Sequence, residues 1–169
     1  TMAPKTDDTV MEAMFFAALT GGAQAVAAWL DAGGGVDSRY AERKGETLLM
    51  AAAAGGQEAI VRMLLQRGAS VNLQNFLGGT ALMDAAYNGH ATMIVQALLD
   101  AKADTSLQDN DSSTALMIAE QEQHIVTAAL LRQHAKPQAP GRPHDLPPAS
   151  GTLSGCRVRI AGLKGRPEL

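Results

Sequence analysis

The sequence is poor in aromatic residues and nearly free of cysteine. Of its 169 residues, 46% are hydrophobic but only 4% are aromatic. A core must therefore be built from Ala, Leu, Val, Ile and Met, which favours closely packed helices. Cys156 is the single cysteine, and one thiol can form neither an internal disulfide nor a zinc site. This favours an intracellular protein, in a compartment that the sequence leaves open.

Basic residues are scarce in most of the chain. Residues 1–135 contain 8 Lys and Arg against 15 Asp and Glu, whereas residues 136–169 contain 6 against 2. Neutralising phosphates requires clustered Lys and Arg, so we expect the acidic body not to bind nucleic acid. A basic tail of this charge density is more typical of a solvated segment than of an anion-binding site.

Residues 13–30 carry no charge, and a run of this length resembles a membrane span. However, Gly21, Gly22 and Gln24 interrupt the run, and acidic rather than basic residues precede it. We therefore predict a buried helix pair here and no membrane span.

A signature recurs along the chain at a fixed period. Thr-x-Leu-Met begins at Thr47, Thr80 and Thr114, with spacings of 33 and 34 residues. Self-similarity at this period indicates stacked repeats.

Each part of the unit has a physical reason to recur. The threonine hydroxyl can cap the first amides of a helix, and the alanine pair that follows lets helices of neighbouring repeats approach closely. Gly56 and Gly89 end that helix, because glycine adopts the left-handed conformation without a steric clash. Apolar pairs at helical spacing, such as 60–61 with 64–65, predict a second helix.

These features resemble the ankyrin repeat. The resemblance implies an all-α solenoid of helix-turn-helix units joined by β-hairpin fingers. The composition after Lys136 predicts a disordered C-terminal extension. The expected repeats occupy about 8–41, 42–74, 75–108 and 109–136 of a domain at 8–136. The first repeat is divergent, as end repeats of solenoids are.

Several positions depart from the family pattern. Met50, Met83 and Met117 stand where the family usually has histidine, and we expect them to pack between repeats. Lys102 occupies the place of Gly68, which predicts a strained left-handed residue. One residue is inserted near 91–93, which we expect a wider turn to absorb, and Glu120 and Gln123 make the fourth repeat a C-terminal cap.

Residues 137–155 are rich in proline and glycine, which predicts a linker. In residues 156–169, Val158 and Ile160 alternate with Arg157 and Arg159, a strand-like pattern. This stretch resembles the start of an SH3-like barrel found beside ankyrin arrays in some algal and protist proteins. The barrel would be truncated, so an alternative to a self-sufficient binding module is the regulatory or targeting segment of a larger enzyme.

The sequence offers no convergent catalytic set, so we expect no enzyme activity, no cofactor and no metal site. His90 and His124 are 34 residues apart, and the repeat itself explains them. The remaining histidines, His134 and His144, have no Cys or carboxylate at metal-ligand spacing.

The resemblance implies that a protein partner of unknown identity contacts the fingertips and the concave face of the inner helices. We expect the chain to be monomeric in isolation. Phe76, Leu77 and Tyr87 are the most informative candidates, because apolar side chains there have no core to fill. The alternative is that Phe76 and Leu77 only lean on the preceding finger. The full set of candidate contact residues is Arg39, Tyr40, Arg43, Lys44, Glu46, Phe76, Leu77, Tyr87, Asn88, Asn110, Asp111 and Gln121.

Overall fold

The structure is a computed structural model that describes residues 8–89 and 92–135. The predicted linker, the strand-like segment at 156–169 and residue His90 lie outside the described residues.

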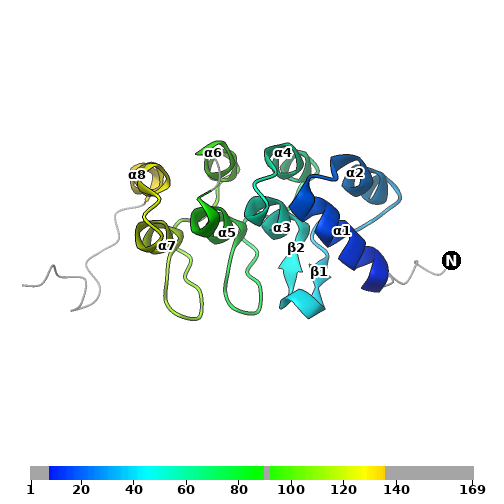
Figure 1. The fold of residues 1–169 in the computed structure, drawn as a ribbon, viewed down its shortest axis with the longest axis horizontal. Helices are drawn as coiled ribbons and strands as arrows, with labels where there is room; N and C mark the ends of the chain where they lie inside the picture. Colours follow the sequence, from blue (N-terminus) through cyan, green and yellow to red (C-terminus); the bar gives the residue numbers. More distant parts are fainter. Residues whose placement is uncertain (1–7, 90–91, 136–169) are drawn as a thin grey trace, which may run out of the picture. The chain divides into compact units, whose positions relative to one another are not determined.

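The described residues form helix pairs stacked side by side, with an inner and an outer row (Figure 1). The inner helices pack on one another in sequence order, and so do the outer helices. This confirms the predicted all-α solenoid. The pairs, inner helix first, are α1 (Asp8–Thr20) with α2 (Ala23–Asp31), α3 (Leu48–Ala54) with α4 (Glu58–Gln66), α5 (Ala81–Asn88) with α6 (Thr92–Asp100), and α7 (Ala115–Gln121) with α8 (Ile125–His134).

Threonine begins three of the inner helices, as predicted. The Oγ1 atoms of Thr47, Thr80 and Thr114 accept hydrogen bonds from the backbone N–H three residues later, at 3.3 to 3.4 Å. All three threonines are buried. Each hydroxyl therefore satisfies an amide that the helix itself leaves unpaired.

The positions predicted to be left-handed are left-handed. Gly56 and Gly89 have φ of 72° and 62°, and Gln123 at the same place in the last repeat has φ of 61°. Lys102 has φ of 67° where Gly68 has 86°. The repeat geometry is thus retained where the glycine is lost. Residues 90 and 91, which include part of the predicted insertion, lie outside the described residues.

Small residues bring the inner helices together. Ala52, Ala53, Ala85 and Ala86 have no solvent exposure. Gly55 lies directly against the backbone of Leu19 in the preceding repeat, where a Cβ would clash. The outer helices supply larger buried side chains to the same core, namely Val26, Ile60, Val61, Leu64, Ile94, Val95, Leu98 and Leu131.

The prediction of a buried helix pair at 13–30 is right about the helices and wrong about the extent of burial. Helices α1 and α2 bury Phe15, Ala18 and Val26, but Phe16 is 63% exposed. An end repeat has a neighbour on one side only, so part of its apolar surface remains in contact with water. The other end shows the same effect, with Ile125 80% exposed.

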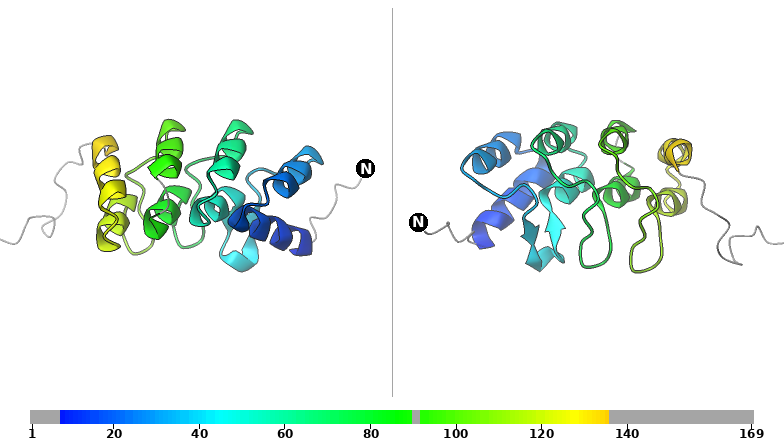
Figure 2. Two further views of the ribbon diagram at one scale, coloured as in Figure 1. Left: turned by 45° about the horizontal axis from the view of Figure 1, so that its top comes forward. Right: turned by 180° about the vertical axis from the view of Figure 1, so that it is seen from behind.

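The fingers project from one side of the helix rows (Figure 2). In the first, β1 (Arg39–Tyr40) and β2 (Glu46–Thr47) pair antiparallel around the 3-10 turn η1 (Ala41–Arg43). The predicted hairpins carry no further strands within the described residues. In their place, the side chains of Asn75 and Asp109 each accept two backbone N–H groups and close the later fingers.

Candidate functional site

The first finger is anchored on the first helix by aromatic contacts. Tyr40 is only 5% exposed, and its ring centroid lies 5.7 Å from that of Phe15. Its hydroxyl donates to Glu42 Oε2 at 2.8 Å, and this hydrogen bond is the main cause that raises the pKa of Tyr40 to about 12. The Arg43 guanidinium lies 5.3 Å from the Phe15 centroid. The Tyr40 ring is therefore buried, and the role of Tyr40 as a contact residue stays a prediction.

The second finger carries an exposed apolar tip. Phe76 is 63% exposed and Leu77 is 46% exposed. The Phe76 ring lies against Gly45 of the first finger, so close that a Cβ at Gly45 would come within 2.6 Å of it. Phe76 therefore leans on the preceding finger and still presents most of its surface to solvent, so the two interpretations of this residue do not exclude each other.

Backbone hydrogen bonds connect each fingertip to the next. Phe76 N donates to Lys44 O at 2.7 Å, and Asn110 N donates to Leu77 O at 2.9 Å. Asn110 also donates through Nδ2 to Phe76 O at 3.2 Å. The Asn110 amide is thus engaged in holding the tips together, whereas the neighbouring Asp111 is exposed.

Side chains also tie the finger bases together. Arg39 Nη1 donates to Gln74 O at 2.7 Å, and Gln74 Nε2 donates to Gln108 O at 2.9 Å. Arg39 remains exposed while making this contact. The fingers are therefore connected at both base and tip, which makes them one surface.

The C-terminal ends of the inner helices add further exposed groups. Tyr87 is 59% exposed, and Asn88 and Gln121 are also exposed. Asn88 Nδ2 donates to Asp84 O at 2.9 Å. The Tyr87 carbonyl oxygen accepts a hydrogen bond from Nε2 of His124 at 3.0 Å, whereas the Tyr87 aromatic ring lies at the surface.

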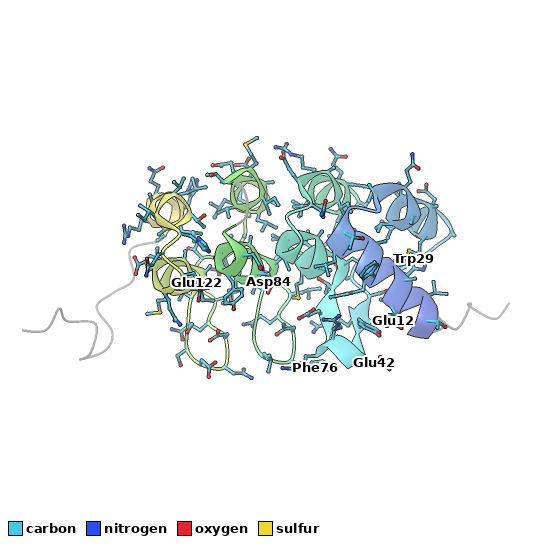
Figure 3. All side chains as sticks on the ribbon, in the orientation of Figure 1. Glu12, Trp29, Glu42, Phe76, Asp84 and Glu122 are labelled. Carbon is cyan, nitrogen blue, oxygen red and sulfur yellow. The ribbon has the colours of Figure 1, made fainter. Side chains whose placement is uncertain are left out.

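One acidic group on α5 is unusual. The Oδ2 atom of Asp84 is buried and has no hydrogen-bond partner among the described residues. Burial and, second, the charge of Glu46 raise the pKa of Asp84 to about 7. Burial also raises the pKa of Glu46, against the opposing effect of Arg43 and Lys44. Figure 3 labels Asp84 at α5, between the outer helices and the fingers.

The methionine and histidine side chains that recur with the repeat take part in packing. Met50 and Met83 are buried in the core, and Met117 is 42% exposed on α7, the last inner helix that the structure describes. The His124 ring packs against Gly89 of the preceding repeat. No group of three or more His, Cys, Asp or Glu side chains is arranged to hold a metal ion within residues 8–89 and 92–135.

Stacked helix pairs with connected fingers define the chain as a solenoid-type repeat protein. The ankyrin-repeat family model, described as ankyrin repeats in three copies, matches residues 3–75 and 71–140. The chain therefore belongs to the ankyrin-repeat family. Ankyrin repeats are generally protein–protein interaction modules and typically non-enzymatic.

Two further observations complete the comparison. A search of curated proteins returned no match to the chain. Among the residues that the structure describes, no helix combines the length and the apolar character that crossing a membrane requires.

Proposed function

We propose that this chain is a non-enzymatic binding module that recognises a segment of a protein partner along its fingertips and inner-helix ends. The observation that carries the proposal is the exposure of Phe76, Leu77 and Tyr87. Contiguous apolar patches on a protein surface mark contact sites, whereas single exposed apolar side chains are common, and Phe76 and Leu77 are neighbours on one fingertip. Aromatic side chains in particular dominate interface energies.

The finger network supports this proposal. Because the tips are hydrogen-bonded to one another, little conformational freedom remains to be lost when a partner binds. Preorganisation of this kind increases affinity by lowering the entropic cost of association. The Tyr40 ring supports the first finger through its contact with Phe15.

The test compares the double variant Phe76→Ala and Tyr87→Ala with wild type in binding to peptides selected on the wild-type full chain from a random displayed library. We expect the double variant to lose about tenfold or more in affinity, the usual size of a hot-spot loss. Met93→Ala is the matched control, because Met93 is 51% exposed but lies on outer helix α6.

Circular dichroism and thermal melting of the same variants separate binding from folding. Both Phe76 and Tyr87 are largely exposed, so the melting temperature of the double variant should stay close to that of wild type. Unchanged peptide affinity in the double variant, or equal losses in the Met93→Ala control, would refute the proposal.

A further inference from the structure

The position of Asp84 is one at which the fold requires no charge. Asp84 lies four residues after the capping Thr80, and the same place is occupied by Ala51 after Thr47 and by Ile118 after Thr114. Ala51 is buried and Ile118 is half-buried. The repeat architecture is therefore satisfied by an apolar side chain here, and the carboxyl group calls for a reason other than packing.

The carboxyl group is also unpaired. Its Oδ2 has no hydrogen-bond partner among the described residues, although it is shielded from water. Buried polar groups are almost always hydrogen-bonded in folded proteins, and the rare exceptions concentrate where a ligand or a function supplies the partner. Oδ2 itself is shielded, but Asp84 as a whole is half-buried, so a partner side chain approaches the residue at its solvent-facing atoms and reaches Oδ2 only after a local side-chain shift.

The charges around Asp84 do not neutralise it. Glu46 on β2 is the charged group that acts on Asp84, and it is itself acidic. The basic residues Arg43 and Lys44 act on Glu46. The ion pairs found in the described part of the chain join Arg62 to Glu58, Arg67 to Asp31 and Arg132 to Glu120, and none involves Asp84 or Glu46.

An exposed aromatic ring accompanies this acidic pair. Tyr87 follows Asp84 by three residues on α5, which places the two side chains on adjacent positions of one helix face. A lysine or arginine side chain has an apolar stem that packs on an aromatic ring and a cationic head that pairs with carboxylates. Such a side chain matches both features.

We propose that Asp84, assisted by Glu46, binds one lysine or arginine side chain of the partner segment, with the stem of that side chain against Tyr87. This inference rests on the proposed function and specifies the chemistry of the partner. The excess of acidic over basic residues in residues 1–135 also favours the approach of a basic segment.

The test uses the same displayed random peptides, selected on the wild-type full chain. We expect the selected peptides to share a Lys or Arg, and we expect Asp84→Asn to weaken their binding at least about tenfold, as truncation of one partner of a desolvated charge pair does. Asp100→Asn is the matched control, because Asp100 is an exposed acid at the end of outer helix α6, away from the fingertips and inner-helix ends, and the affinity of this variant should be unchanged.

The pH profile provides a second readout. The pKa of Asp84 is raised to about 7, so its carboxylate form, which attracts a cation, becomes populated as pH rises from 6 to 8. Affinity of the wild type should therefore increase over this interval, and the Asp84→Asn variant should lose most of the increase.

The outcomes separate this inference from the proposed function. Loss of binding in the Phe76→Ala and Tyr87→Ala variant with full binding by Asp84→Asn would overturn the role of Asp84 and leave the module intact. Selected peptides without a shared basic residue would also overturn it. So would unfolding of Asp84→Asn, because the carboxyl group would then be structural. Failure to select any peptide would count against both proposals.

Discussion

At the scale of single residues, the glycine places of the repeat show where the chain tolerates strain. Lys102, Ser112 and Gln123 have φ between 61° and 67° at places where earlier repeats have glycine. A residue with a Cβ costs roughly 1 to 2 kcal/mol in this conformation. The later repeats therefore keep the backbone geometry of the earlier ones, at a cost in the free energy of unfolding.

Replacing Lys102 by glycine should therefore stabilise the protein. We expect the free energy of unfolding to rise by about 1 kcal/mol, because glycine adopts this left-handed conformation without the steric penalty of a Cβ atom. Urea unfolding of the full chain measures the change. An unchanged or lower free energy of unfolding would show that the Lys102 side chain makes stabilising contacts that outweigh the strain.

The reverse substitution at Gly68 is the matched control. Gly68 has φ of 86°, and a Cβ added there would meet no atom within 4 Å. Gly68→Ala should lower the free energy of unfolding by about 1 kcal/mol through backbone strain alone. Opposite signs for the two variants would isolate the backbone effect.

At the scale of structural elements, one side chain organises each later finger. Asn75 Oδ1 accepts from Leu77 N at 2.9 Å and from Gly79 N at 2.8 Å, and the backbone N–H of Asn75 donates to Gly79 O. Asp109 repeats the arrangement with Asp111 and Ser113. Asx turns of this kind substitute for strand pairing.

Asn75→Ala should loosen the second finger without unfolding the helices. Two backbone amides would lose their acceptor, which costs about 1 kcal/mol for each hydrogen bond. Hydrogen exchange at the amides of Leu77 and Gly79 should become faster, while exchange within α5 should stay slow. Equally fast exchange throughout α5 would show that the finger is needed for the helix, contrary to this prediction.

The sequence predicted the elements better than the environment of individual side chains. Thr80, Gly56 and Gly89 act locally, so their period revealed the helix boundaries. The buried Tyr40 ring contacts Phe15, and the repeat pattern does not relate the positions of these two residues. Likewise, the repeat pattern says nothing about the surroundings of the Asp84 carboxyl group, because its burial and its interaction with Glu46 arise only when two repeats stack.

At the scale of the whole molecule, stability depends on how many neighbours a repeat has. Leu64 in α4 and Leu131 in α8 occupy the same place in their repeats and are both fully buried. Helix α4 packs against α2, α3 and α6, whereas α8 packs against α6 and α7. In a solenoid, the terminal unit therefore unfolds at lower free energy than an internal one.

Leu64→Ala should destabilise the whole array by about 2 to 5 kcal/mol, the range for a buried leucine. Leu131→Ala should instead release the last repeat alone. Hydrogen exchange distinguishes the two outcomes, since Leu131→Ala should remove protection from α7 and α8 while α3 and α5 remain protected. Global loss of protection in that variant would mean that the array unfolds as one unit.

The hydrogen bonds between fingertips have a consequence for how such a chain can lengthen. The second finger donates through Phe76 N to the finger before it and accepts through Leu77 O from the finger after it. A tandem duplication of residues 75–108 would bring a matching donor and acceptor with every new copy. Recombination at this period can therefore extend the recognition surface, because each new fingertip finds a backbone partner in the fingertips on both sides.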